Sequence, residues 1–96
     1  MSNYRLTRGA RQDLREITQY LAKESPASVH RVIDVLHDTF RFLSEHPHAG
    51  TVRDDLRPEL RVFSPKRPAH NYVVFFRPTN YGIQVLAVLH GARDYE

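Results

Sequence analysis

Apolar residues recur at helical spacing twice in the first half of the chain. The first stripe has intervals of four, three and four residues, and charged or amide side chains fill the positions between them. This spacing predicts an amphipathic helix of about four turns. Thr7 precedes the stripe as its expected N-cap, and residues 3–6 are expected to form a short strand. The apolar positions of this helix are Ala10, Leu14, Ile17 and Leu21.

A second stripe follows Ser25-Pro26, a pair that is typical of a helix start, because serine caps the first turn and proline is tolerated at the first helical position. His46-Pro47 is expected to end this helix. Because a loop of about three residues joins the two helices, they should form an antiparallel hairpin. The second stripe consists of Val29, Ile33, Leu36, Phe40 and Leu43, widened by Val32 and Phe42.

The pattern changes after residue 47. Proline, glycine and aspartate residues predict an irregular charged connection, and strands are then expected at 60–64, 71–77 and 83–90, with a turn at 78–82. The run 71–77 is β-branched and aromatic, which is typical of the middle of a sheet. Strict alternation is expected in the last strand. It would put Ile83, Val85, Ala87 and Leu89 on one face and Gln84, Leu86, Val88 and His90 on the other.

The element order predicts an α+β fold. An N-terminal strand is followed by an antiparallel helical hairpin and then by a three-stranded antiparallel set, forming one small sheet with the hairpin laid across one of its faces. A length of 96 residues and a mass of 11.2 kDa predict a single domain over 1–96.

Composition narrows the function classes. The chain has no cysteine, which excludes a disulfide scaffold and a thiolate metal site. It has no apolar run of signal-peptide or membrane-spanning length, so we expect a cytoplasmic protein without membrane contact. The net charge of +3 is concentrated in residues 47–77, which carry +3, against +1 in 1–46 and −1 in 78–96. Any anionic partner is therefore expected at the middle of the chain, although direct nucleic-acid binding does not follow from a charge of this size.

Two sets of polar residues are candidates for chemistry. The first places imidazoles and carboxylates within one turn of the second helix, which would suit a metal, but a solvated helix face accounts for them as well, and no metal or other cofactor is expected. This set is His30, Asp34, His37 and Asp38. The same two interpretations apply to His46 and His48, which flank Pro47. A histidine at a helix C-terminus interacts favourably with the helix dipole, which explains His46 without a ligand role.

The second set is basic. Cations that stabilise a phosphorane-like transition state, together with one proton-transfer residue, would suffice for a metal-free ribonuclease. An ordinary charged surface, or a surface for an acidic peptide, explains the same residues. The cations are Arg57, Arg61, Lys66, Arg67 and Arg77, and the proton-transfer candidates are His70, His90 and Tyr95. Glycine-rich phosphate loops and nucleophile elbows are absent from the sequence.

The chain ends shortly after His90-Gly91-Ala92-Arg93-Asp94, a motif that follows an apolar strand. With this ending and the elements before it, nearly the whole chain resembles toxins of the ParE/RelE superfamily of bacterial type II toxin–antitoxin systems. The positions that carry the resemblance are 6–7, 10, 13–14, 17, 20, 43, 47, 50, 53–56, 60–61, 72–77, 83 and 88–94.

The resemblance implies the α+β fold predicted above and a cognate antitoxin, ParD-like or related, that wraps and neutralises the toxin. A helical hairpin and open sheet edges would suit a partner segment that folds on binding. The candidates for antitoxin contact are Leu14, Ile17, Leu21, Leu36 and Phe40, which the core also needs.

The superfamily includes gyrase poisons that resemble ParE and ribosome-dependent messenger-RNA nucleases that resemble RelE. The nuclease branch places a basic residue within the strand that matches 72–76, and here that strand has no cation before Arg77. The resemblance therefore favours a non-enzymatic inhibitor of DNA gyrase. Its target-binding candidates are Arg61, Arg77, His90, Arg93 and Asp94. The alternatives are a ribosome-dependent endoribonuclease using Arg61, Arg77, His90 or Tyr95, and a toxin that has lost its activity.

Overall fold

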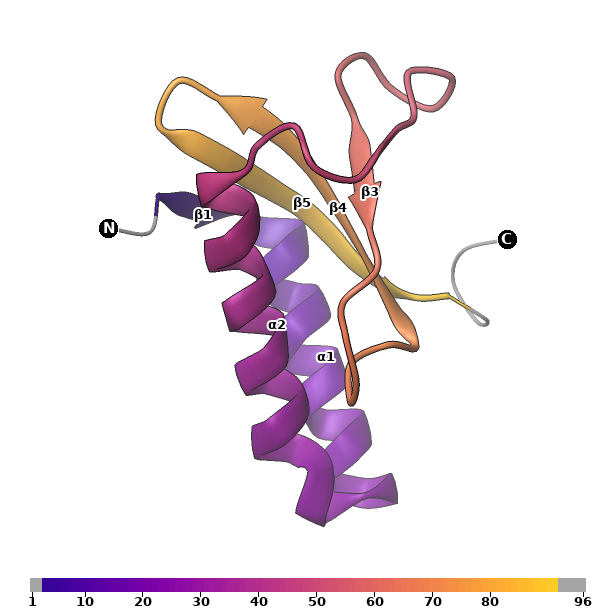
Figure 1. The fold of residues 1–96 in the computed structure, drawn as a ribbon. Helices are drawn as coiled ribbons and strands as arrows, with labels where there is room; N and C mark the ends of the chain where they lie inside the picture. The colour runs from indigo at the N-terminus through magenta and orange to yellow at the C-terminus, as the bar shows by residue number, and fades with distance from the viewer. Residues whose placement is uncertain (1–2, 92–96) are drawn as a thin grey trace.

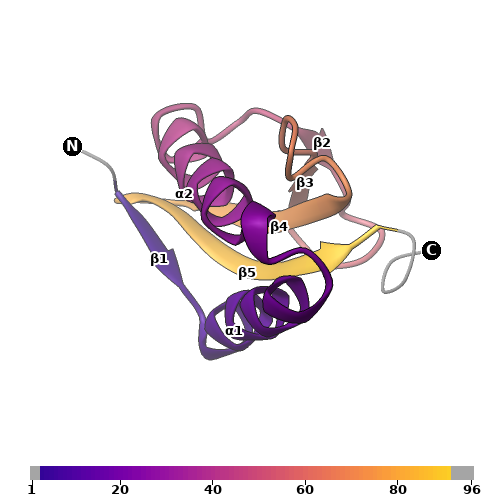
Figure 2. The ribbon, with the colours of Figure 1, turned by 90° about the horizontal axis from the view of Figure 1, so that it is seen from below.

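The computed structural model describes residues 3–91. Five strands form one sheet in the order β1-β5-β4-β3-β2, and two long helices lie side by side across one face of it (Figure 1). Figure 2 shows both helices in front of the sheet, which spreads from β1 to β2. The predicted α+β class and helical hairpin are confirmed. The elements are β1 (Tyr4–Leu6), α1 (Arg8–Glu24), the 3₁₀ turn η1 (Pro26–Ser28), α2 (Val29–Glu45), β2 (Thr51–Val52), β3 (Arg61–Phe63), β4 (Tyr72–Thr79) and β5 (Gly82–His90).

The start of α1 follows the prediction, whereas the start of α2 differs from it and has no side-chain cap. The Thr7 hydroxyl accepts a hydrogen bond from the Ala10 N–H at 3.1 Å, which confirms the predicted N-cap of α1. Ser25-Pro26 begins η1 rather than α2 itself, and the Ser25 hydroxyl bonds the Ser28 hydroxyl at 2.8 Å instead of a backbone N–H. α2 ends at Glu45, immediately before His46-Pro47, as predicted.

The core lies between the hairpin and the sheet. Each helix supplies one apolar face to it, and β4 and β5 supply alternate side chains. Neither helix of residues 3–91 is long and apolar enough to cross a membrane. The largest fully buried side chains are Leu36, Phe40, Leu43, Val74, Phe76, Ile83 and Val85.

The sheet differs from the prediction at both edges. β1 pairs parallel with β5, with Tyr4 opposite Ile83, so the sheet is mixed rather than antiparallel throughout. Apolar periodicity reports which face of a strand is buried but not its direction, which depends on how the connections lead the chain. The two-residue strand β2, unpredicted, pairs with β3 at the other edge. β3, β4 and β5 are antiparallel, as expected.

β4 is longer than predicted. It continues through Pro78 and Thr79, which were assigned to the turn, and pairs there with Ile83 and Gly82. Proline is tolerated at this place because β3 pairs with β4 only from Val74 to Phe76, so no strand needs the missing Pro78 N–H.

A β-bulge overturns the alternation expected in β5. Phe75 pairs with Ala87 and Phe76 with Val85, so Leu86 is an extra residue on β5. The buried face therefore changes phase, and Val88 is 2% exposed where alternation predicted Ala87 and Leu89 to continue the face of Val85.

The N-cap residue of α1, Thr7, and Asp13 within the helix form hydrogen bonds to the backbone of β5 at this bulge. The Asp13 carboxylate accepts a hydrogen bond from the Val88 N–H at 2.9 Å, and the Thr7 hydroxyl donates to the Leu86 carbonyl at 3.1 Å. β1 ends at Leu6, so these two side chains satisfy backbone groups on the stretch of β5 that β1 does not reach.

Gly82 closes the link between β1 and the β4–β5 turn. Its φ is +143°, and a Cβ there would lie 2.0 Å from the Asn3 carbonyl oxygen. That oxygen accepts a hydrogen bond from the Ile83 N–H at 3.1 Å. Only glycine lets the two backbones approach this closely.

Candidate functional site

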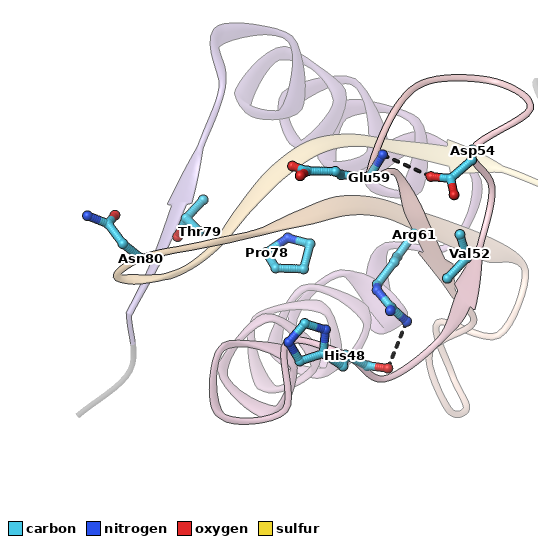
Figure 3. Close-up of a pocket in the computed structure, with 8 residues that line it drawn as sticks. All are labelled: His48, Val52, Asp54, Glu59, Arg61, Pro78, Thr79 and Asn80. Atoms are coloured by element: carbon cyan, nitrogen blue, oxygen red, sulfur yellow. Dashed lines mark hydrogen bonds between the residues drawn. The ribbon is translucent and has the colours of Figure 1, made fainter.

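The end of the sheet away from the helix connection holds the largest of the described pockets. Its volume is about 490 Å³, and it opens between β2, the loop after it and the β4–β5 turn (Figure 3). Of the described residues predicted to bind the target or to cleave RNA, only Arg61 lines this pocket. The lining residues are His48, Val52, Asp54, Glu59, Arg61, Pro78, Thr79 and Asn80.

Arg61 is fixed in the pocket wall. It is half-buried, and its Nη1 donates to the His48 carbonyl oxygen at 2.8 Å, across the end of α2 (Figure 3). Asp54 and Glu59 bring two carboxylates to the same pocket. A pocket lined by one arginine and two carboxylates suits recognition of polar groups on a partner rather than tight binding of a free phosphate, because the carboxylates repel an anion.

The loop after β2 is held by local hydrogen bonds. The Arg53 N–H donates to the Leu60 carbonyl at 2.8 Å and the Glu59 N–H donates to Asp54 Oδ1 at 2.9 Å. Glu59 has a φ of +65°, in the left-handed region that non-glycine residues enter at a cost. The loop therefore keeps a strained residue at the wall of the pocket.

An ion pair braces the same loop. Arg53 Nε and Nη2 each lie 3.0 Å from one oxygen of the Asp55 carboxylate, a bidentate arrangement. The side-chain hydrogen bonds and the opposite charge lower the pKa of Asp55 below its usual value and raise the pKa of Arg53. Both groups are solvent-accessible, so water and salt weaken this pair.

Arg77 lies apart from Arg61. Arg61 pairs with Phe76, so their side chains share one face, and the next residue, Arg77, points to the other face. Arg77 Nε donates to Gln84 Oε1 at 2.8 Å across the β4–β5 ribbon.

His90 lies at the far end of the ribbon. It pairs with Tyr72, and the two rings meet edge to face with centroids 5.4 Å apart. Tyr72 and Arg77 are separated along β4 by roughly 16 Å, at about 3.3 Å per residue. The described members of the ribonuclease set, Arg61, Arg77 and His90, therefore do not converge on one point. Arg93, Asp94 and Tyr95 lie outside the described residues.

The residues predicted to touch an antitoxin belong mainly to the core. Leu36 and Phe40 have no exposed surface, and Ile17 and Leu21 are 6% and 9% exposed. Only half-buried Leu14 offers surface. It lines a shallow pocket of about 350 Å³ between α1 and α2.

Several large apolar side chains are exposed at positions where the sequence pattern did not indicate surface residues. Phe42 was predicted to widen the buried stripe of α2 but is 43% exposed, stacked on His46 and in contact with Phe63. Its position, two residues beyond Phe40, turns it away from the core, which is the signal that a helical-wheel reading could have used. The exposed large apolar residues are Tyr20, Phe42, Val52 and Leu56.

The histidine-rich face of α2 is engaged in other contacts. His37 Nδ1 shares a 2.8 Å hydrogen bond with the Tyr4 hydroxyl, and Asp38 forms an ion pair with Arg41. Among residues 3–91, no three His, Cys, Asp or Glu side chains come together as a metal site would need. His46 Nδ1 lies 3.1 Å from the Phe42 carbonyl, the interaction expected of a histidine at a helix C-terminus.

Comparison with known proteins adds a family. Residues 4–95 match the model of the ParE toxin of type II toxin-antitoxin systems, parDE. Among solved structures, a chain of the chromosomal ParDE TA system from P. aeruginosa is similar, with a TM-score of 0.74 and 21% identity, over 94% of this chain and 96% of that one. At this identity the similarity supports the fold. A search of the curated proteins finds no match.

Proposed function

Because this chain belongs to the ParE toxin family of type II toxin–antitoxin systems, we propose that it acts in the cytoplasm as a toxin that binds DNA gyrase and blocks replication. A co-expressed antitoxin, ParD-like or related, neutralises it. The action is inhibition by protein binding, without a chemical step carried out by the toxin itself.

The observation that carries this proposal is the dispersal of the reactive candidates. A site that cleaves RNA needs its cations and its proton-transfer group within hydrogen-bond reach of one phosphate. Arg61 and Arg77 project from opposite faces of β3–β4, and His90 lies at the other end of the ribbon. Binding to a protein surface has no such requirement, since contacts spread over a broad area contribute together.

The Arg61 pocket is the surface that we assign to the target. Arginine is enriched among the residues that dominate protein interfaces, and Arg61 is already held in place by the His48 carbonyl, which lowers the entropy lost on binding. Val52, 46% exposed, adds apolar surface at the pocket rim.

The antitoxin requires a different surface. Leu14, with Arg15 and Ile33, lines the shallow groove that the pocket between α1 and α2 forms. A helix of the antitoxin with apolar residues at helical spacing would suit this groove. The buried candidates act there only as support for the two helices.

The decisive experiment measures supercoiling by purified gyrase in the presence of the full-length toxin. Inhibition, accumulation of cleaved DNA and reversal by the antitoxin are the expected results. Arg61→Met should weaken inhibition at least several-fold, in line with the loss of an interface arginine. Arg31→Met, which removes an exposed charge from α2, is the matched control and should inhibit normally.

The assay also separates the alternatives. If the protein cleaves transcripts on translating ribosomes and leaves supercoiling unaffected, its function is that of a ribonuclease and the proposal of gyrase inhibition is wrong. A folded protein that stops neither growth nor supercoiling would identify a toxin that has lost its activity. Equal inhibition by Arg61→Met and wild type would move the target surface away from this pocket.

A further inference from the structure

Three long polar side chains form a row across β1, β5 and β4, on the face of the sheet opposite the helical hairpin. Arg5 lies opposite Gln84, and Gln84 lies opposite Arg77. Directly opposed residues of neighbouring strands project from the same face. This face is turned away from the helices (Figure 1), because Phe76 and Val85, the chain neighbours of Arg77 and Gln84, are fully buried in the core beneath the hairpin.

Uncharged groups orient both guanidinium groups of the row. The Arg5 guanidinium lies over the Tyr81 ring, with its central carbon 4.3 Å from the ring centroid. Arg77 Nε donates to Gln84 Oε1 at 2.8 Å. An aromatic ring or an amide orients a guanidinium without neutralising its charge. Each arginine therefore presents further N–H donors from a defined position, and the Gln84 amide nitrogen adds its own donors to them.

The strands themselves supply no negative charge to balance these arginines. Within the described strands β1 to β5 there is no Asp or Glu, and the only Lys or Arg residues are Arg5, Arg61 and Arg77. Among residues 3–91, neither Arg5 nor Arg77 forms an ion pair. Charge complementarity therefore favours an anionic partner at the row.

The kind of anion follows from the number of cations and from their surroundings. A nucleic-acid backbone is bound by many cations, each neutralising one phosphate, and the row supplies two. Leu86, two residues beyond Gln84 on β5, adds a half-buried apolar side chain beside them. A protein segment with both acidic and apolar residues complements this mixture better than a chain of phosphates does.

An extended acidic segment also fits the spacing of the row. Alternate residues of an extended chain project from one side, about 6.6 Å apart. The Cα atoms of Arg5 and Arg77 are two strand spacings apart, roughly 10 Å, and the long arginine side chains cover the difference. Each carboxylate can accept two parallel N–H bonds from one guanidinium.

We propose that the Arg5–Gln84–Arg77 row is a docking site for an acidic, extended segment of a protein partner. Carboxylates of the segment accept hydrogen bonds from Arg5 and Arg77, and the Gln84 amide donates a further one. Arg61 projects from the opposite face of the sheet, so the row is separate from the pocket that we assign to the target. The proposal does not depend on which target the toxin inhibits.

Titration of the full-length protein with a synthetic peptide tests the site. The probe is acetylated Glu-Val-Glu-Val-Glu-Val, and the matched control peptide has Gln in place of every Glu. NMR spectra should show amide shifts concentrated at Arg5, Gln84 and Arg77. The control peptide should bind at least about fivefold more weakly, because neutral hydrogen bonds are weaker than charge-assisted ones. Added salt should weaken binding of the Glu-Val peptide.

Substitutions then test the two arginines. Arg5→Gln and Arg77→Gln should each weaken binding of the Glu-Val peptide at least about threefold, because each removes one charge-assisted contact. Arg31→Gln, at an exposed position of α2, removes the same charge elsewhere and should change binding less than about twofold. Because Arg5 is exposed, Arg5→Gln tests the site independently of any effect that loss of half-buried Arg77 has on the sheet.

Three results would overturn the proposal. Equal binding of the two peptides, or no amide shifts at millimolar peptide, would mean that the row does not recognise carboxylates. Shifts centred on Arg61 or on Leu14 would place the acidic segment on another surface. Tighter binding of a six-nucleotide oligothymidylate than of the Glu-Val peptide, abolished by Arg5→Gln, would make the row a nucleic-acid surface instead. Because every readout uses the toxin alone, each stays decisive even if gyrase proves not to be the target.

Discussion

The helix-covered half of the molecule and the loop between β2 and β3 are stabilised in different ways. In the helix-covered part, the conformation depends on packing, since Leu36, Phe40 and Phe76 are fully buried and belong to one core cluster. In the loop, residues 54–59 are all exposed, and local hydrogen bonds hold the backbone. Packing fixes the frame of the molecule, while the loop presents polar side chains beside the Arg61 pocket.

The difference has a functional consequence. A substitution in the core changes the free energy of unfolding, whereas one in the loop or the pocket can change binding with little effect on folding. Substitutions in the core should therefore change stability more than substitutions in the loop. The predictions below test this difference, from the largest expected effect to the smallest.

Two phenylalanines of α2 give the sharpest contrast. Phe40→Ala should lower the free energy of unfolding by about 3–5 kcal/mol, because the buried ring leaves a cavity. Phe42→Ala should cost less than about 1 kcal/mol, because Phe42 is 43% exposed. Urea denaturation of both variants measures the difference, and equal losses would contradict the division between core and surface.

A single hydroxyl at the start of α1 should have the next largest effect. Thr7→Ala removes both the N-cap bond to the Ala10 N–H and the bond to the Leu86 carbonyl at the bulge. The expected loss is about 1–2 kcal/mol. Thr7→Ser keeps the hydroxyl and is the control. If both variants unfold at the same denaturant concentration, the hydroxyl is not what stabilises this junction.

How far the sequence predicts the structure follows the same division. The apolar spacing was sufficient to predict both helices, because each helix buries one face in the core. Thr7 was sufficient to predict the start of α1, because an N-cap is a local interaction. The bulge at Leu86 was not predictable, because its backbone groups are satisfied by Thr7 and Asp13, which are distant in sequence. β2 escaped prediction because a two-residue exposed strand has no apolar pattern.

The candidate site was less predictable than the fold. Arg61 was proposed from its charge, but the pocket beside it depends on His48 and on the left-handed conformation of Glu59, which no periodicity encodes. Leu36 and Phe40 were proposed as contacts although their burial serves the core, because the same apolar stripe predicts both roles. A pattern in one chain cannot separate stability from binding when both use the same residue type.

Strain at Glu59 gives a prediction of opposite sign in the loop. Glu59→Gly should raise the free energy of unfolding by a few tenths to about 1 kcal/mol, because relief of the left-handed φ exceeds the entropy that glycine adds to the unfolded chain. Glu59→Ala keeps the strain and is the control. Thermal unfolding compares them, and a destabilised Glu59→Gly would mean that the carboxylate contributes more than the strain costs.

The smallest effect is expected at the ion pair that braces the loop. Because Arg53 holds the pKa of Asp55 below its ordinary value of 3.8, the folded state gains stability from this pair above the pKa of unfolded Asp55 and loses it as the pH falls through the lower folded pKa. NMR titration of the Asp55 carboxyl should show its pKa rising toward 3.8 in Arg53→Gln and in high salt. Arg57→Gln removes a charge from the same loop without touching the bidentate contact, so it should leave most of the shift in place. If both substitutions change the pKa of Asp55 equally, the general field of the loop, rather than the two hydrogen bonds from Arg53, sets its charge, and the loop is less rigidly held than its hydrogen bonds imply.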